Sequence, residues 1–241
     1  MRRGVLVLRP CRFIPIILPY FADRDTGILS AMSLIRSIKA NQTVFYQGEA
    51  VTKVYHLNSG LVRSYIIHDN GDESTIAFFG PNDIFPITSA YNITPVTLFY
   101  YETIVDSVVM VYDEAEFATE SAVDPQAELH RFATRYVGAL LHVSALAQQT
   151  ASLKLCHTLR YLAVRFGEKL VMGSRTKVTI KLTQHDLAAL SNLSRETVSI
   201  ELTKLKRQDI ISVKAKYYYV NLAKLNAMIS QESTPITLQT T

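Results

Sequence analysis

Arg195, Glu196 and Ser199 lie close together in a short polar segment near the carboxy-terminal end of the chain. An arginine can donate two parallel hydrogen bonds to O6 and N7 of guanine, a glutamate can accept one from N4 of cytosine, and a serine is permissive. Such donors and acceptors are typical of side chains that read base edges in the major groove of DNA. We expect the Arg195-Glu196 pair to favour G and C positions.

The residues from Leu182 to Ser199 have the pattern of a helix, a tight turn and a second helix that presents these side chains. Thr183 and Ser194 can cap the two helices, and Asn192 tolerates the left-handed conformation that the turn requires. The apolar residues predicted to fix the angle between the helices are Leu187, Leu190, Val198, Leu202 and Leu205. The alternative is an ordinary helical domain in which Arg195 and Glu196 form a solvated surface pair.

A β-hairpin that ends in cations is predicted after the second helix. Ile210–Val213 and Tyr217–Val220 flank Lys214-Ala215-Lys216, and phosphates are the natural partners of such a tip. Residues 174–224 hold ten Lys and Arg against four Asp and Glu, so we expect DNA binding with a marked salt dependence.

The charge divides unevenly along the chain. Residues 40–130 have a net charge of −11, whereas residues 131–241 have +10 and residues 1–39 have +5. An acidic body with a basic carboxy-terminal domain is expected if only that domain contacts a polyanion.

A long helix is predicted over residues 124–150. Asp124-Pro125 supplies a helix start, as does Asp113-Glu114-Ala115-Glu116 for a shorter helix before it. The apolar positions follow the alternating three- and four-residue spacing of a two-stranded coiled coil and are Leu129, Phe132, Tyr136, Ala139, Val143 and Leu146. We therefore predict that this helix pairs with its twin in a homodimer; an amphipathic helix packed on its own domain is the alternative.

A second helix is predicted at about Leu153–Leu170, with core positions at Leu155, Leu159, Leu162 and Phe166 and an end near Gly167 to Gly173.

Residues 43–112 read as an antiparallel β region, in which short runs rich in β-formers alternate with turn signals. Asn70-Gly71 predicts a type I′ hairpin turn between two of these runs. The predicted strands are enough to close a small barrel or jelly roll and are Thr43–Tyr46, Val54–Leu57, Leu61–His68, Glu73–Phe79, Val96–Ile104 and Ser107–Tyr112.

Composition limits the class of protein. With 241 residues and 48% apolar content, the chain can bury two modest cores. Cys11 and Cys156 fit neither a disulfide framework nor a metal site, so a reduced cytoplasm is expected.

The apolar run Phe13–Phe21 is short and contains two prolines, which excludes a spanning helix. Met32 could be an internal translation start, in which case residues 1–31 would belong to no fold.

The segment Leu193–Val198, together with the predicted wing, closely resembles the carboxy-terminal domain of CRP/FNR-type transcription regulators. Upstream, Val44–Glu49, Val54–Leu57 and Ser59–Arg63 look like the opening of that family's cyclic-nucleotide-binding-type β-roll. The resemblance spans about residues 40 to 225. It implies a cytoplasmic DNA-binding homodimer with RNA polymerase as a further partner.

The resemblance also assigns roles to single residues. It implies base reading by Arg195 and Glu196. The phosphate contacts that it implies are Thr183, Gln184, His185, Ser194, Thr197, Lys214 and Lys216. Many members have a second arginine where this chain has Ile200, which could contact a thymine methyl group or pack in the domain.

The sensor region departs from members that bind cyclic AMP. Those members hold the phosphate with a Gly-Glu pair and an Arg-Ser or Arg-Thr pair, whereas residues 80–102 here contain no lysine or arginine. A cyclic nucleotide is therefore not expected, although a cyclic-nucleotide-dependent activator remains the alternative within the family. The cysteines needed for an iron–sulfur cluster are lacking, and His56, His68, His142 and Cys156 are expected at the surface or in packing rather than on a haem. We predict no cofactor and no metal.

An apolar effector pocket is the remaining hypothesis for the sensor. The stretch Ile84–Val105 resembles that of members without the phosphate cassette, such as PrfA, whose pocket accepts glutathione or peptides. A neutral or peptide-like effector is expected, or none, and the candidate pocket residues are Phe78, Phe79, Phe85, Tyr91, Tyr100 and Tyr136. The alternative is that these aromatics are core residues, which is the more frequent role of such side chains.

An enzyme is the rival class. A cupin-like metal enzyme would need a His-x-His pair with a following glutamate, and a serine hydrolase would need a Gly-x-Ser-x-Gly elbow; the sequence contains neither. We therefore predict an α+β protein without catalytic residues. Its expected parts are an extension (1–37), a sensor β-roll (38–123), a dimerisation helix (124–150), a winged helix-turn-helix (151–230) and a tail (231–241).

Overall fold

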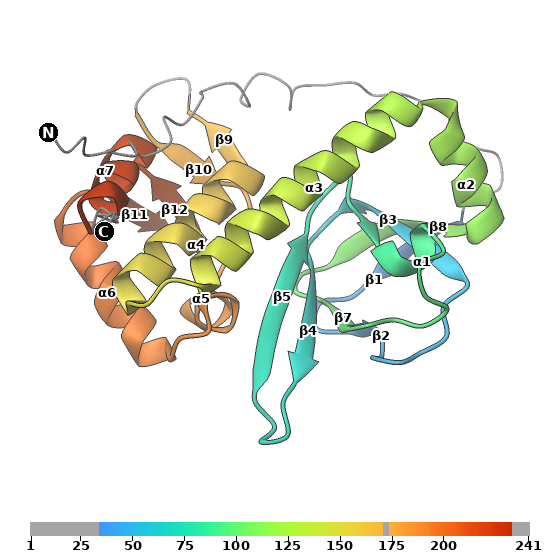
Figure 1. The fold of residues 1–241 in the computed structure, drawn as a ribbon, viewed down its shortest axis with the longest axis horizontal. Helices are drawn as coiled ribbons and strands as arrows, with labels where there is room; N and C mark the ends of the chain where they lie inside the picture. Colours follow the sequence, from blue (N-terminus) through green and yellow to red (C-terminus); the bar gives the residue numbers. More distant parts are fainter. Residues whose placement is uncertain (1–33, 171–173, 233–241) are drawn as a thin grey trace, which may run out of the picture.

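The computed structural model describes residues 34–170 and 174–232. The candidate start at Met32 and most of the predicted extension and tail lie outside the described residues. The fold is α+β, as predicted: an antiparallel β-roll is followed by a long helix and a winged helix-turn-helix domain (Figure 1).

Two antiparallel sheets of four strands each form the β-roll. The strand orders are β1-β8-β3-β6 and β2-β7-β4-β5. The strands are β1 (Leu34–Ile38), β2 (Thr43–Phe45), β3 (Lys53–Ser59), β4 (Val62–Ile67), β5 (Glu73–Phe79), β6 (Ile84–Phe85), β7 (Tyr100–Thr103) and β8 (Ser107–Asp113). β1 pairs with β8 along its whole described length, so the sheet already includes Leu34, ahead of the expected domain start at residue 38.

The hairpin between β4 and β5 is confirmed, but its turn is not of type I′. Of the two residues in Asn70-Gly71, only Gly71 has a positive φ, at 84°, whereas a type I′ turn needs both. The Gly71 amide donates to the carbonyl of His68, and the Asn70 side chain accepts from the Asp72 amide. The loop is therefore a longer turn that places its single left-handed residue at the glycine.

Aromatic rings fill the space between the two sheets. Phe85 is fully buried at the centre, with its ring 5.6 Å from that of Tyr55 and 5.7 Å from that of Tyr101. Phe79 and Phe45 close the cluster at centroid distances of 5.8 Å and 6.4 Å from Phe85. The two sheets therefore bury one aromatic core.

One short helix lies within the roll and two helices follow it. The single-turn α1 (Ile87–Ala90) lies between β6 and β7, and α2 (Glu114–Val123) is preceded by its N-cap residue Asp113, whose amide donates to Glu116. The long α3 (Pro125–Leu146) begins with Pro125, and Asp124 caps it by accepting from the Ala127 amide at 2.9 Å. Both predicted helix starts are confirmed. No helix among the described residues combines the length and apolarity that a membrane crossing requires.

The next helix ends just before Gly167, at the early limit of the range predicted for its end. α4 (Ala151–Arg165) ends before Gly167, and Gly167–Lys169 forms the strand β9 instead of continuing the helix to Leu170. A Cβ on Gly167 would come within 1.9 Å of the Ala163 carbonyl oxygen, so only glycine allows the chain to leave the helix this closely. The predicted core residues Leu155, Leu159, Leu162 and Phe166 are buried.

The carboxy-terminal domain places helices against a small antiparallel sheet in the order β11-β12-β10-β9. Its remaining elements are β10 (Thr176–Val178), α5 (Gln184–Ser191), α6 (Arg195–Arg207), β11 (Ile211–Lys214), β12 (Tyr217–Val220) and α7 (Leu222–Glu232). The helix α7 was not predicted from the sequence, although Asn221 caps it and Leu225 and Ile229 are buried at helical spacing.

The β-roll and the carboxy-terminal domain pack against each other. Leu61 and Phe78 of the roll belong to the same apolar cluster as the buried residues of α4, α5 and α6. Asp83, just before β6, accepts from Arg135 of α3 at 3.1 Å and from Arg165 of α4. The junction is therefore both apolar and ionic.

His142 of α3 joins the same junction through its ring nitrogens. Nδ1 lies 2.9 Å from the carbonyl oxygen of Ile76 in β5, and Nε2 lies 2.8 Å from that of Leu190 in α5. Ile76 is the extra residue of a bulge between β4 and β5, which frees its carbonyl for this contact. His142 is therefore a buried bridge between the roll and α5.

Candidate DNA-binding interface

The turn between α5 and α6 has the predicted geometry. The Thr183 hydroxyl accepts from the Asp186 amide at 3.2 Å at the start of α5, and the Ser194 hydroxyl accepts from the Thr197 amide at 3.1 Å at the start of α6. Asn192 ends α5 with φ 51° and ψ 52°, in the left-handed region. All five apolar residues predicted between the helices are buried. The angle of α6 is therefore fixed by caps and core together.

The first two turns of α6 present polar side chains to solvent. Arg195 and Glu196 are exposed and Ser199 is half-buried. Together with Gln184 of α5 and Ile200, they line a shallow hollow of about 350 Å³. Neither Arg195 nor Glu196 forms an ion pair with another of the described residues, so both are available to a ligand.

Capping reduces the number of hydroxyl groups available to phosphates. The Thr183 hydroxyl donates to the Asp186 carboxylate at 2.7 Å, so a phosphate would compete for that proton. The hydroxyls of Ser194 and Thr197 lie 2.9 Å apart, and because one donates to the other, one proton of the pair remains free. Gln184 is half-buried and His185 is exposed at the start of α5.

The wing is a tight hairpin whose two lysines are exposed. Ala215 and Lys216 both have positive φ, at 50° and 67°, which is the conformation of a type I′ turn. The Lys216 carbonyl accepts from the Leu182 amide at 3.1 Å, so the tip of the wing lies beside the start of α5. The wing lysines Lys214 and Lys216 are thereby held near the helix-turn-helix.

The tyrosines of β12 pack within the wing. Burial and the negative charge of Asp186 raise the pKa of Tyr218 to about 12. The ammonium groups of Lys177 and Lys181 lie 4.6 Å and 5.6 Å from the ring centroid of Tyr217. These contacts keep two further cations next to the wing.

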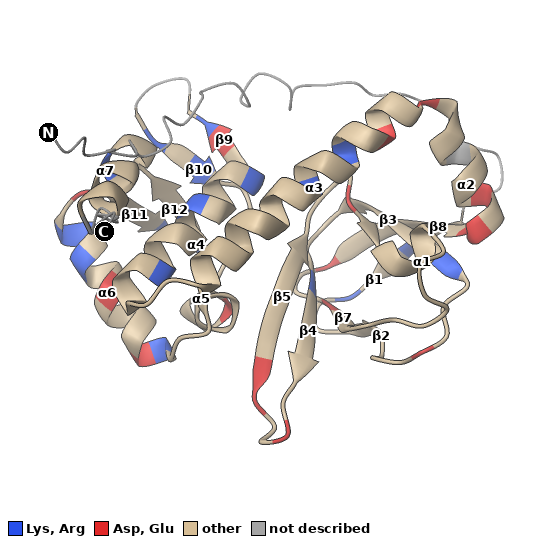
Figure 2. Ribbon diagram, in the orientation of Figure 1, with Lys and Arg blue, Asp and Glu red and all other residues tan. Residues whose placement is uncertain are grey.

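The charges are segregated in space as they are along the sequence. Lysines and arginines lie over the carboxy-terminal domain, and acidic residues lie at the tip of the β4–β5 hairpin and on α2 (Figure 2). A polyanion would therefore meet the helix-turn-helix rather than the roll.

The predicted coiled-coil positions of α3 face solvent in the single chain. Leu129 and Val143 are 66% and 62% exposed, and Tyr136 is 57% exposed. The opposite face, with Gly138, His142 and Ala145, is buried against the protein's own domains. The helix therefore has one buried face and one apolar face, and no part of the described chain covers the apolar face.

The six predicted pocket residues do not line a common cavity. Neighbours along a strand face opposite sides, so Phe79 enters the core of the roll while Phe78 enters the junction with the carboxy-terminal domain. Phe85 fills the centre of the roll, and Tyr136 is exposed on α3.

The remaining two aromatics lie at the edges. Tyr100 stacks on Tyr65 at 5.2 Å. Tyr91 packs edge-on against Phe117 and Phe132. Burial, and then the hydrogen bond from its hydroxyl to Glu128, raise the pKa of Tyr91.

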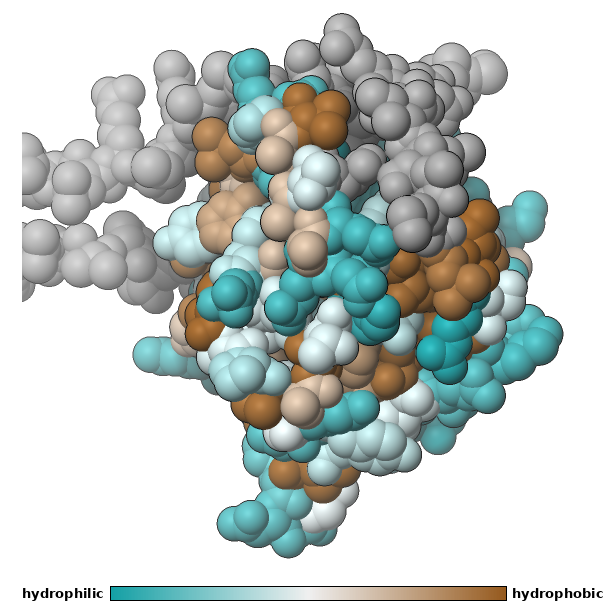
Figure 3. Space-filling view, turned by 90° about the vertical axis from the view of Figure 1, so that its right-hand side faces the viewer, coloured by the Kyte–Doolittle hydropathy of each residue, from teal (hydrophilic) through white to brown (hydrophobic). Residues whose placement is uncertain are grey.

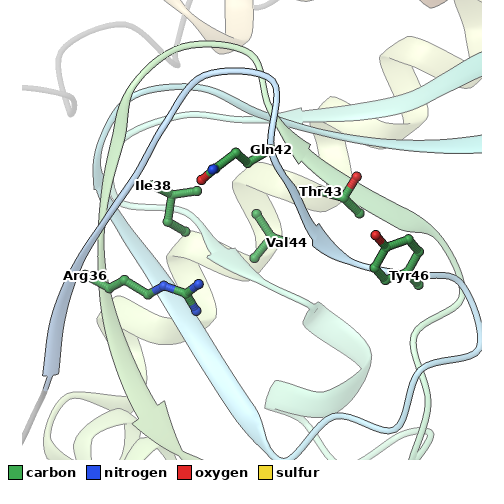
Figure 4. A pocket seen from close by; sticks show the side chains of 6 residues that line it. All are labelled: Arg36, Ile38, Gln42, Thr43, Val44 and Tyr46. Atoms are coloured by element: carbon green, nitrogen blue, oxygen red, sulfur yellow. The ribbon is translucent and has the colours of Figure 1, made fainter.

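The surface of the β-roll has an open hollow elsewhere. It has a volume of about 290 Å³ and lies between β1 and β2 (Figure 4); its lining residues are Arg36, Ile38, Gln42, Thr43, Val44 and Tyr46. At this end of the molecule, apolar side chains lie in separate patches among hydrophilic ones (Figure 3).

The two cations within residues 40–130 are already paired. Arg63 donates to Glu102 at 2.8 Å and to Glu73 at 2.6 Å, and Lys53 donates to Asp113. A phosphate bound in the roll would have to displace carboxylates from these partners.

The residues that join the two domains were not predicted from the sequence. Arg135, Gly138, His142 and Ala145 recur at helical spacing on α3, so a second face of this helix could have been found. The partner Asp83 carried no local signal, because it lies 82 residues from Arg165.

Comparisons with known proteins match both halves of the chain. The family model described as "Crp-like helix-turn-helix domain" matches residues 153–228, and the one described as "Cyclic nucleotide-binding domain" matches residues 35–121. The nitrogen fixation regulation protein FixK of Rhizobium meliloti (strain 1021) is 25% identical over 187 residues, which cover 77% of this chain and 82% of the relative. The global nitrogen regulator of Nostoc sp. (strain PCC 7120) is 23% identical and covers 81% of this chain and 88% of its own.

A solved structure has the same arrangement. The structure of FixK2 from Bradyrhizobium japonicum superimposes with a TM-score of 0.65 at 23% identity, covering 81% of this chain and 96% of that one. At this identity the likeness concerns the fold.

Proposed function

Because the chain belongs to the CRP/FNR family of helix-turn-helix transcription regulators, we propose that it is a homodimer that binds specific DNA sequences through α6 and controls promoters. In this proposal the protein acts in the cytoplasm, has no enzymatic activity, and has RNA polymerase as a further partner.

The observation that carries the proposal is that the amino-terminal turns of α6 expose polar side chains to solvent. A helix that enters the major groove contacts bases with residues near its amino-terminal end and is positioned by phosphate contacts around it. Arg195, Glu196 and Ser199 occupy the first two turns of α6, and the wing lysines lie close to the start of α5. We assign base contacts to these three residues.

Phosphate contacts are assigned to the surrounding groups. They are Thr183, Gln184, His185, Ser194, Thr197, Lys214 and Lys216. The hydroxyls that cap the helices contribute less than the lysines, since their protons are shared with other side chains.

The solvent-facing stripe of α3 supports the homodimer. Its apolar side chains recur with the spacing of a two-stranded coiled coil, and such a stripe is stabilised when a second copy covers it. In the two-state mechanism that we propose, packing of the two α3 helices sets the spacing of the two α6 helices against half-sites about one helical turn apart.

The effector of the β-roll is proposed to be something other than a cyclic nucleotide, or to be absent. The carboxylates around Arg63 and Lys53 support this, because a buried phosphate needs a positive partner. A cyclic-nucleotide-dependent activator would need an arginine from outside the cassette. Arg135 and Arg165 approach the segment before β6, but both are bound to Asp83. Saturable binding of cyclic AMP in calorimetry would contradict our assignment.

Selection of bound duplexes from a random pool tests the function directly. The full chain should enrich one motif with two inverted half-sites, because two α6 helices related by a two-fold axis read the same sequence in opposite directions. Enrichment of no motif at any salt concentration, with and without cell extract, would contradict the proposal.

A further inference from the structure

Ile200 is an exposed apolar residue on the face of α6 that we assign to base reading. Its side chain is 57% exposed, whereas the other apolar residues of α6, Val198, Leu202 and Leu205, are buried. The sequence left open whether Ile200 packs in the domain or contacts DNA. Its exposure rules out a packing role within the described chain.

The position of Ile200 on the helix places it among the polar readers. Glu196 and Ile200 are four residues apart, as are Arg195 with Ser199, so the two pairs lie side by side on the helix surface. All four line the hollow of about 350 Å³ that Gln184 closes from α5. A base pair that contacts Glu196 therefore also lies near Ile200, or has a neighbouring base pair that does.

An isoleucine can distinguish base pairs in one way only. It has no hydrogen-bond donor or acceptor on its side chain, so it cannot read the polar edge of any base. In the major groove, the C5-methyl group of thymine is the apolar group that distinguishes one base from the others. Contact between the two removes apolar surface of both from water.

We propose that Ile200 selects a T·A base pair in each half-site by packing against the thymine C5-methyl group. This inference rests on the proposed function of α6 and adds a base identity that Arg195 and Glu196 do not supply. The selected T·A pair adjoins the base pair read by Glu196, since the two side chains are neighbours on one face of α6. Each half-site then contains the G·C pairs that Arg195 and Glu196 contact and, next to them, one T·A pair that Ile200 contacts.

Replacing thymine by deoxyuridine tests the proposal, since this change removes only the methyl group. In a duplex obtained by selection, we expect deoxyuridine at one thymine per half-site to weaken wild-type binding about fourfold, the factor that corresponds to one buried methyl-sized group. Deoxyuridine at the other thymines serves as the matched control and should leave binding unchanged.

The variant Ile200→Ala should bind the thymine and deoxyuridine duplexes equally. Because Ile200 is exposed, this substitution does not remove core packing. Ile200→Val should keep most of the preference, since valine retains a branched apolar side chain. Selection with Ile200→Arg should replace the thymine by a guanine contact at that position and leave the remaining positions unchanged.

Two results would overturn the inference while the proposed function holds. One is equal wild-type affinity for thymine and deoxyuridine at every position of a selected duplex; the other is a thymine preference that persists in Ile200→Ala. Failure to select any duplex would instead overturn the proposed function itself.

Discussion

Asp83 of the β-roll and Arg165 of α4 form a buried ion pair, and the guanidinium of Arg165 contacts both carboxylate oxygens. The two side chains are 6% and 13% exposed, and Arg135 of α3 donates to the same carboxylate at 3.1 Å. One carboxylate therefore connects the β-roll, the long helix and the carboxy-terminal domain.

Asp83→Asn should destabilise the protein markedly, because it leaves two buried guanidinium groups without a counter-charge. We expect the free energy of unfolding to fall by about 3 kcal/mol in urea denaturation. Asp106→Asn is the matched control, since Asp106 pairs with Lys39 at the surface, with the two side chains 66% and 78% exposed. Equal losses in the two variants would show that the buried pair does not hold the domains together.

Val143→Glu should convert the protein to a monomer. In the proposed homodimer, a charge placed at a coiled-coil position faces its own copy across the two-fold axis and loses solvation on pairing. Ile93→Glu makes the same change at an apolar side chain that is equally exposed, at 65%, but lies outside α3. Sedimentation equilibrium should give a dimer for Ile93→Glu and the wild type. A dimeric Val143→Glu would locate the subunit interface elsewhere.

His157 of α4 should make stability depend on pH. Burial, followed by repulsion from Arg160, lowers the pKa of His157 from 6.5 to about 4. The unfolded chain binds a proton on His157 more tightly than the folded protein does. The stability that neutral His157 contributes is therefore fully present above about pH 6.5 and is lost as the pH falls towards about 4. His157→Gln should therefore lose less stability between pH 7 and pH 4.5 than the wild type does. Parallel curves for the wild type and His157→Gln would contradict the assignment.

The wing turn should gain stability from a residue suited to positive φ. Ala215 adopts φ 50°, where a β-carbon costs about 1 kcal/mol, so Ala215→Gly should raise the free energy of unfolding by roughly 0.5 kcal/mol. Ala118→Gly in α2 should have the opposite effect, since glycine in a helix costs about 1 kcal/mol. Chemical denaturation of the two variants gives the sign of the change in the free energy of unfolding for each. A loss in both would indicate that Ala215 does not occupy this turn conformation in solution.

Local chemistry made the helix-turn-helix predictable. Thr183, Asn192 and Ser194 each act within three or four residues of chain, and the structure confirms the caps and the left-handed turn. The start of α3 was predictable for the same reason, from Asp124 and Pro125. The hairpin turn was not, because Asn70 is used for a side-chain hydrogen bond rather than for a positive φ.

Contacts between distant segments were not predictable from spacing. The sequence places the adjacent aromatics Phe78 and Phe79 in one pocket. Because side chains alternate along β5, Phe78 instead lies in the core at the domain junction and Phe79 in the core of the roll. His142 was expected at the surface or in packing, and only the fold brings a bulged strand and the end of α5 to its two ring nitrogens. Side chains that act between domains therefore need the three-dimensional arrangement.

The central claim is that Arg195 reads a base while Lys216 contacts a phosphate, and binding titrations of a selected and a scrambled duplex test it most directly. Arg195→Ala should lose about 1–3 kcal/mol on the selected duplex and little on the scrambled one. Lys216→Ala should weaken both duplexes alike and reduce the salt dependence of binding by about one phosphate contact. Equal losses on the two duplexes for both variants would contradict the account.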